Sequence, residues 1–106
     1  MPSSPVVHVV IFKYKPGVSV AHIQQVTDAF RALQHRIAGI LRFEQGINNS
    51  PEGLNQGFTH IYTLTFESAQ ARDAYLPHPE HQAFGALVQG LEIVDGVFVV
   101  DYVPLP

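Results

Sequence analysis

Cysteine is absent from this chain of 106 residues. Its absence excludes disulfide bonds, thiolate nucleophiles and metal or iron–sulfur sites that use cysteine ligands. Charged residues are also few, at 14% of the chain, whereas hydrophobic residues reach 46%. Disordered chains show the opposite balance. The sequence therefore predicts one folded domain over residues 1–106, in which residues 1–5 form a disordered or extended tail.

Basic residues are too few and too dispersed for a nucleic-acid surface. The six Lys and Arg are scattered along the chain, and the formal net charge is −3. Binding to nucleic acid needs a stripe of positive charge that neutralises successive phosphates. We therefore expect no nucleic-acid partner.

A long hydrophobic run is missing from the N-terminal region. The apolar run from Val6 to Phe12 is interrupted by His8 and ends at Lys13. Such a run is too short to span a membrane, and the residues before it lack the basic flank of a signal peptide. These features predict a cytoplasmic protein with no membrane partner.

Four segments have the composition of β-strands, because they are rich in β-branched and aromatic residues and are bounded by turn-forming residues. They cover residues 6–14, 40–47, 58–66 and 96–102. In the third segment, strict alternation separates two faces. The face that we expect to meet the core and the pocket carries His60, Tyr62, Leu64 and Phe66.

Helical spacing occurs in three places. Residues 20–37 place apolar side chains at intervals of three and four, and Ser19 is the predicted N-cap. A short second helix is expected over residues 68–76, because the prolines that follow disfavour helix. A third helix restarts at Pro79 and ends near residue 92, since proline suits the first helical position.

The order of these elements predicts an α+β fold of the ferredoxin-like βαββαβ type, a four-stranded antiparallel sheet with the helices on one face. The first and last strands are apolar on both faces, so one helical layer leaves the other sheet face uncovered. We expect a second copy of the chain to cover that face and form a homodimer, because a two-fold interface uses the same patch twice. The alternative is that C-terminal residues fold back over it.

Five segments carry a family resemblance that runs in order over nearly the whole chain: residues 7–17, 57–60, 65–68, 75–84 and 100–102. The most specific part is His78-Pro79-Glu80-His81, which follows an aromatic-bearing helix. Together the segments resemble the stress-responsive dimeric α/β-barrel (Dabb) family. The resemblance implies a homodimer whose two sheets close a barrel, with a cavity in each subunit between sheet and helices. It implies no single activity, since one fold hosts many functions.

One characterised plant member of that family is a polyketide cyclase that performs an aldol cyclisation with a Tyr and a His. By motif, Tyr75 and His81 match that pair, and His8 and His60 match two further pocket histidines. The resemblance thus implies Tyr75 and His81 as candidate catalytic residues.

The chemistry of these two side chains suits a reaction without a cofactor. His81 is expected in the first turn of a helix, where unpaired N–H groups and the helix dipole favour a neutral imidazole. A neutral imidazole can remove a proton from a carbon next to a carbonyl, and the Tyr75 phenol can hydrogen-bond the enolate oxygen. The alternative is that both side chains only pack the helix break and bond carbonyl groups that the prolines leave unpaired.

A wider set of residues is predicted to line the substrate-binding pocket: His8, Val10, Phe12, Phe30, His60, Tyr62, Leu64, His78, Phe84 and Val99. The three-residue separation of His78 and His81 invites a metal site, but no Asp or Glu is placed to complete a ligand set. We therefore expect no metal and no cofactor. Glu67 and Asp101 are expected to be ordinary solvated or capping carboxylates near strand ends.

Several functions remain open at this point. The first is a cofactor-free lyase or cyclase that acts on a small carbonyl compound. The second is a protein that binds a small hydrophobic or aromatic ligand without turnover. A stress-related structural oligomer and a cofactor-independent monooxygenase are further alternatives, the last resting on fold analogy alone.

Overall fold

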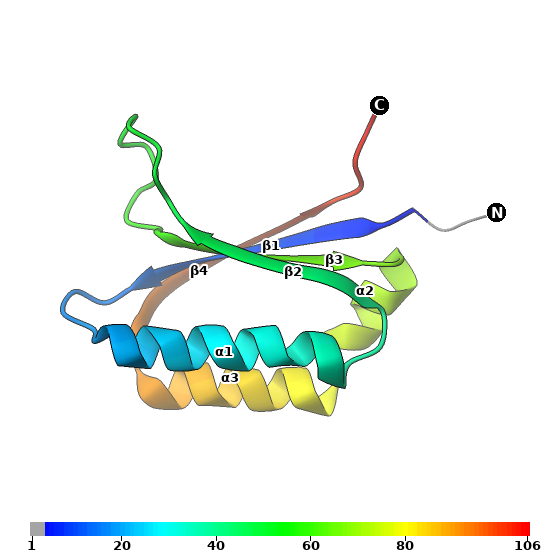
Figure 1. The fold of residues 1–106 in the computed structure, drawn as a ribbon, viewed down its shortest axis with the longest axis horizontal. Coiled ribbons are helices and arrows are strands. Elements are labelled where there is room, and N and C mark those ends of the chain that lie inside the picture. Colours follow the sequence, from blue (N-terminus) through cyan, green and yellow to red (C-terminus); the bar gives the residue numbers. More distant parts are fainter. Residues whose placement is uncertain (1–3) are drawn as a thin grey trace.

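A computed structural model describes residues 4–106, so the first three residues of the predicted tail lie outside the described residues. Ser4 and Pro5, the rest of that tail, carry no regular secondary structure. The elements in chain order are β1 (Val6–Tyr14), α1 (Val20–Arg36), β2 (Ile40–Ile47), β3 (His60–Phe66), α2 (Ala69–Tyr75), α3 (Pro79–Leu91) and β4 (Val94–Tyr102). All seven predicted elements are therefore present (Figure 1).

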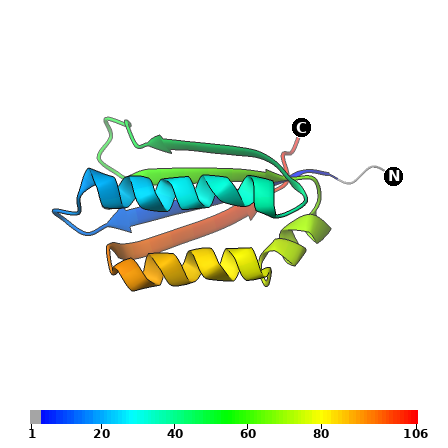
Figure 2. The ribbon, with the colours of Figure 1, turned by 60° about the horizontal axis from the view of Figure 1, so that its bottom comes forward.

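The four strands form one antiparallel sheet in the order β2-β3-β1-β4. The helices cover one face of this sheet and leave the other face open (Figure 2). This arrangement confirms the predicted ferredoxin-like fold. The central strand β1 pairs with both β3 and β4, so His8 stands between Leu64 on one side and Asp101 on the other.

Element boundaries differ from prediction by one or two residues. β3 begins at His60 rather than Phe58, because the Phe58 N–H donates to the Asn55 carbonyl and closes the preceding loop. β4 begins at Val94 rather than Gly96, because Val94 pairs with Tyr14 after a shift in register. Such end effects are common, since capping turns compete with strand pairing for the same backbone groups.

The helix caps follow the sequence closely. Ser19 and Ser68 each accept a hydrogen bond from a backbone N–H of the first turn, as N-cap residues do. His78 caps α3, because its Nδ1 accepts from the Glu80 N–H at 3.0 Å. Pro79 then occupies the first helical position, as predicted. The break between α2 and α3 is thus locally encoded.

The core lies between α1 and the middle of the sheet. Phe30 and Leu33 of α1 are buried, as are Leu64 and Phe66 of β3. Tyr62 is buried too, and its hydroxyl bonds the hydroxyls of Thr27 and Tyr14. Helix α1 therefore covers the middle of β3.

The open face of the sheet carries apolar side chains. Phe98, Val100 and Tyr102 of β4 are about half exposed there, and Val7, Val9 and Ile11 of β1 lie beside them. The loop between β2 and β3 and the segment after β4 both rise on this side, away from the helices (Figure 1). In the part of the chain that is described, no helix has the length and apolar character that a membrane crossing requires.

Candidate functional site

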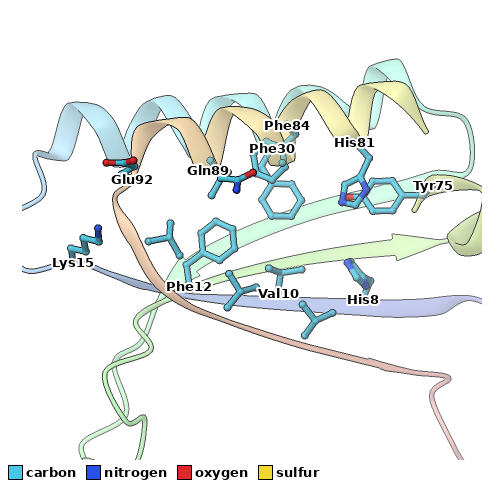
Figure 3. Close-up of a pocket in the computed structure, with 15 residues that line it drawn as sticks. His8, Val10, Phe12, Lys15, Phe30, Tyr75, His81, Phe84, Gln89 and Glu92 are labelled. Carbon is cyan, nitrogen blue, oxygen red and sulfur yellow. The ribbon is translucent and has the colours of Figure 1, made fainter. Parts of the chain in front are cut away.

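A cavity of about 710 Å³ lies between α3 and the strands β1 and β4. Figure 3 shows α3 as its roof and the two strands as its floor. Residues of β1, α1, α2, α3 and β4, together with two that directly follow β1 and α3, line the cavity: His8, Val10, Phe12, Lys15, Phe30, Tyr75, His81, Phe84, Gly85, Val88, Gln89, Glu92, Val94, Val97 and Val99. The cavity exists because α1 covers β3, while α3 stands off from the strands beneath it.

His81 stands at one end of this cavity with a defined orientation (Figure 3). Its Nδ1 lies 2.9 Å from the carbonyl oxygen of Leu76. A carbonyl oxygen can only accept, so Nδ1 carries the proton that is donated. In a neutral imidazole the other nitrogen, Nε2, then has a free lone pair. His81 is thereby arranged as a proton acceptor.

Tyr75 lies directly beside His81, with ring centroids 4.2 Å apart. The Tyr75 side chain is 0% exposed, and its hydroxyl has no hydrogen-bond partner among residues 4–106. Burial raises the pKa of the Tyr75 phenol above its ordinary value of 10.0. The phenol therefore keeps its proton at neutral pH and can act as a hydrogen-bond donor.

His8 projects into the same end of the cavity from β1 (Figure 3). Its Nδ1 lies 2.6 Å from Oδ1 of Asp101, across the β1–β4 ladder. The other carboxylate oxygen of Asp101 accepts from Arg72 of α2 at 2.7 Å. The His8 ring also packs edge-on against Phe66 and Tyr75, each with centroids 5.9 Å away. The hydrogen bond to Asp101 and the two ring contacts thus fix the position of the His8 side chain.

The remainder of the cavity is mainly apolar, and its far rim is polar. Phe12, Phe30 and Phe84 line the middle, where Phe30 and Phe84 have ring centroids 4.4 Å apart. Lys15 and Glu92 lie at the end away from His81 (Figure 3). An elongated or aromatic molecule with a polar group at each end fits this distribution.

Most of the predicted pocket residues meet in this cavity. His8, Val10, Phe12, Phe30, Tyr75, His81, Phe84 and Val99 all line it.

The other predicted residues lie elsewhere and do not line this cavity. Tyr62 and Leu64 face the helix layer as expected, but α1 packs directly on them and leaves no space. His60 stands at the far end of β3, where its ring meets Tyr14 with centroids 4.8 Å apart. His78 uses its side chain to cap α3.

Several residues at the site were not predicted. Asp101 is not an ordinary solvated carboxylate, because both of its oxygens are engaged by His8 and Arg72. Strand alternation places Asp101 on the same face as Val97 and Val99, which is a signal that the sequence contained. The other additions are Lys15, Gly85, Val88, Gln89, Glu92, Val94 and Val97. They depend on how α3 lies over the sheet.

Metal ligands do not converge in the described part of the chain. Within residues 4–106, no group of three or more His, Cys, Asp or Glu side chains has an arrangement that could hold a metal ion. The side chains at the polar end of the cavity are instead suited to hydrogen bonding and proton transfer.

The sequence profile of the family described as Stress responsive A/B Barrel Domain matches residues 6–104. The chain belongs to this family, as predicted. It is 38% identical over 100 residues to the stress-response A/B barrel domain-containing protein HS1 of Arabidopsis thaliana, covering 94% of this chain and 90% of that protein. It is 25% identical over 97 residues to olivetolic acid cyclase of Cannabis sativa, covering 92% of this chain and 94% of the cyclase.

Solved structures of similar proteins share the fold of this chain. The crystal structure of At3g17210 from Arabidopsis thaliana has a TM-score of 0.88 and 37% identity, with 95% of this chain and 96% of that chain covered. Hydroxynitrile lyase from Passiflora edulis, at 24% identity, shares the fold with a TM-score of 0.86 and coverage of 98% and 96%. A dimeric ferredoxin-like protein from Jannaschia sp. has a TM-score of 0.77 and 25% identity, with coverage of 92% and 97%.

Proposed function

We propose that this protein binds a small hydrophobic or aromatic carbonyl compound in the cavity and catalyses a cofactor-free, cyclase- or lyase-like reaction, with His81 as base and Tyr75 as hydrogen-bond donor. The Tyr75 hydroxyl carries the proposal, because it is buried without a partner among residues 4–106. A buried polar group without a partner is destabilising, so such groups often have a functional role. A ligand oxygen that reaches this hydroxyl would supply the missing acceptor.

The placement of His81 supports the same reaction. The Leu76 carbonyl fixes the proton on Nδ1, which leaves the Nε2 lone pair for a proton from the carbon next to the ligand carbonyl. The electron pair of that C–H bond then forms the enolate, whose oxygen Tyr75 stabilises by donation. The Tyr75 hydroxyl is buried, so a ligand oxygen reaches it only when a neighbouring side chain moves.

The comparison with known proteins adds support at the level of reaction class. A curated relative at 25% identity is named olivetolic acid cyclase. The fold alone hosts many activities, so the assignment for this chain depends on its own His81 and Tyr75.

Hydrogen–deuterium exchange at the carbon next to a carbonyl tests the proposed proton transfer. In D₂O, the methyl protons of acetophenone and of ring-substituted acetophenones are followed by proton NMR with wild-type protein and with His81→Asn. We expect faster exchange with the wild type, by about 100-fold for a compound that fits the cavity, the range typical of general base catalysis. Equal rates for the two proteins with every ketone would refute the proposed reaction.

Ligand binding without turnover is the second candidate, and the apolar middle of the cavity favours it. Phe12, Phe30 and Phe84 offer aromatic surface whether or not a proton moves. Saturation-transfer NMR with the same ketones measures binding directly, and Val88→Trp, which fills the cavity, serves as the control. Binding that Val88→Trp abolishes, together with no exchange in the wild type, would establish this second function.

We further propose that the protein is a homodimer joined through the open sheet face. Phe98, Val100 and Tyr102 expose apolar surface there, and a similar fold at 25% identity is described as dimeric. The cavity lies on the opposite, helix-covered side of the sheet (Figure 3). Dimerisation would therefore stabilise the floor of the cavity without filling it.

A further inference from the structure

The rim of the cavity far from His81 carries two opposite charges that the proposed reaction does not use. Lys15 directly follows β1, Glu92 directly follows α3, and both line the cavity at this end (Figure 3). The backbone N–H of Lys15 donates to the carbonyl oxygen of Ile93 at 2.8 Å, so the two chain segments are fixed side by side. The backbone therefore sets the position of this rim.

Glu92 occupies a position that is locally unfavourable for glutamate. Its φ of 54° lies in the left-handed region, where helices usually end with glycine. Its carboxylate also stands at the negative end of the α3 dipole, which favours basic side chains. Helix stability alone would therefore favour a different residue here. A residue that is held in a strained conformation and lines a cavity is a candidate for ligand recognition.

The charges of Lys15 and Glu92 are available to a ligand, because neither side chain forms an ion pair with another part of residues 4–106. A ligand group between them meets a donor on one side and an acceptor on the other. A carboxylate would be attracted by Lys15 and repelled by Glu92, and an ammonium group would meet the reverse. An uncharged group that both donates and accepts satisfies the two residues without desolvation of a ligand charge.

We propose that Lys15 and Glu92 are a pair of specificity-determining residues that bind a hydroxyl group at the far end of the ligand. Lys15 donates to the hydroxyl oxygen, and Glu92 accepts the hydroxyl proton. This inference rests on the proposed function, which places the ligand carbonyl beside Tyr75. It narrows the ligand to aromatic ketones whose hydroxyl group is remote from the carbonyl.

The length of the cavity agrees with a ligand of this kind. The chain rises about 16 Å along α3 from His81 to Glu92. Side chains at both ends take up part of this length, and the aromatic rings of Phe12 and Phe84 line the middle. A single aromatic ring with a short ketone chain on one side and a hydroxyl group on the other therefore matches the order of the lining groups.

Three ketones that differ only in the ring substituent opposite the ketone chain test the preference. They are 4-(4-hydroxyphenyl)butan-2-one, 4-(4-methoxyphenyl)butan-2-one and 4-(3-oxobutyl)benzoate. The methoxy group accepts but cannot donate, and the carboxylate carries a charge. NMR titration measures each dissociation constant. We expect the wild type to bind the hydroxyl compound more tightly than the other two by about fivefold or more, as for a hydrogen bond to a partly solvated charge. Equal affinities, or no binding of any of the three, would overturn the inference.

Removal of one charge at the rim should change which ketone binds best. Glu92→Gln removes the repulsion, so the carboxylate compound should bind more tightly than it does to the wild type, by about fivefold or more. Lys15→Met should weaken binding of the hydroxyl compound. Glu52→Gln, in the exposed loop between β2 and β3, is the matched control with the same change in net charge, and it should alter no affinity. An unchanged order of affinities in Glu92→Gln would overturn the role of Glu92.

Glu92→Gly separates ligand recognition from a purely structural role. Glycine suits the left-handed φ of this position, so the urea midpoint should rise while the preference for the hydroxyl compound is lost. A higher midpoint with the preference intact would show that Glu92 only ends the helix, and would overturn the inference. Deuterium exchange of acetophenone, which lacks the hydroxyl group, judges the proposed reaction separately. No exchange there would refute the reaction and leave the preference at the rim standing.

Discussion

Nδ1 of His81 lies 2.9 Å from the carbonyl oxygen of Leu76, the C-cap residue of α2. This bond turns the imidazole so that Nε2 is free at the polar end of the cavity. An asparagine side chain can place its amide N–H near the position of Nδ1, but it has no basic nitrogen at the position of Nε2. Substitution of His81 by Asn therefore removes the proton acceptor while it keeps the hydrogen bond to Leu76 that positions the side chain.

His81→Asn is expected to abolish catalysis without loss of stability. Because the donor to the Leu76 carbonyl is kept, the free energy of unfolding should change by less than about 1 kcal/mol, the worth of one hydrogen bond. Because the base is lost, exchange should fall about 100-fold. Urea denaturation and the exchange assay measure the two effects. His35→Asn, at an exposed histidine of α1, should change neither, and full activity in His81→Asn would contradict the role of Nε2.

Tyr75→Phe is expected to keep or raise stability while activity falls. The variant removes a buried hydroxyl that has no partner among residues 4–106, so the free energy of unfolding should rise by up to about 1 kcal/mol. Tyr62→Phe is the matched control, because Tyr62 is equally buried but bonds Thr27 and Tyr14. It should lose about 1–3 kcal/mol. A comparable loss in Tyr75→Phe would indicate a hidden structural partner instead.

Phe98→Glu and Val97→Glu test the proposed dimer with neighbouring residues on opposite sheet faces. Their exposed fractions are nearly equal, 51% for Phe98 and 54% for Val97. Only Phe98 lies on the open face, since Val97 lines the cavity. Light scattering should therefore give a dimer mass for the wild type and for Val97→Glu, but a monomer mass for Phe98→Glu at micromolar concentration. A dimer mass for Phe98→Glu would place the interface elsewhere.

His60 is expected to make the fold less stable in mild acid. Burial lowers the pKa of His60 from its ordinary value of 6.5, so the unfolded chain binds a proton more readily than the folded one. The free energy of unfolding should then fall as pH decreases through 6.5 and level off below the pKa of the folded state. The neighbouring Tyr14, whose pKa is raised by burial, stays protonated throughout. Urea denaturation of wild type and His60→Gln at several pH values checks this. Identical slopes would exclude His60 as the source.

The sequence alone was sufficient for the helices and strands. Periodicity, caps and prolines act over a few residues, and they determined the strands, the helices and the break at which His78 caps α3. Tyr75 and His81 were predicted as a pair through the resemblance to the family, and the structure shows that this break brings the two residues into ring contact. The resemblance to the family added the expectation of a cavity.

Only the tertiary structure decided which side chains share the cavity. Alternation correctly places Tyr62 and Leu64 toward the helices, but it does not tell which helix lies above which strand, and α1 packs on both. His8 and Asp101 are 93 residues apart, so their contact requires the pairing of the first and last strands. Local patterns carry no information about a partner at that separation. The oriented His8 is therefore a product of sheet topology, whereas His81 is a product of the local chain.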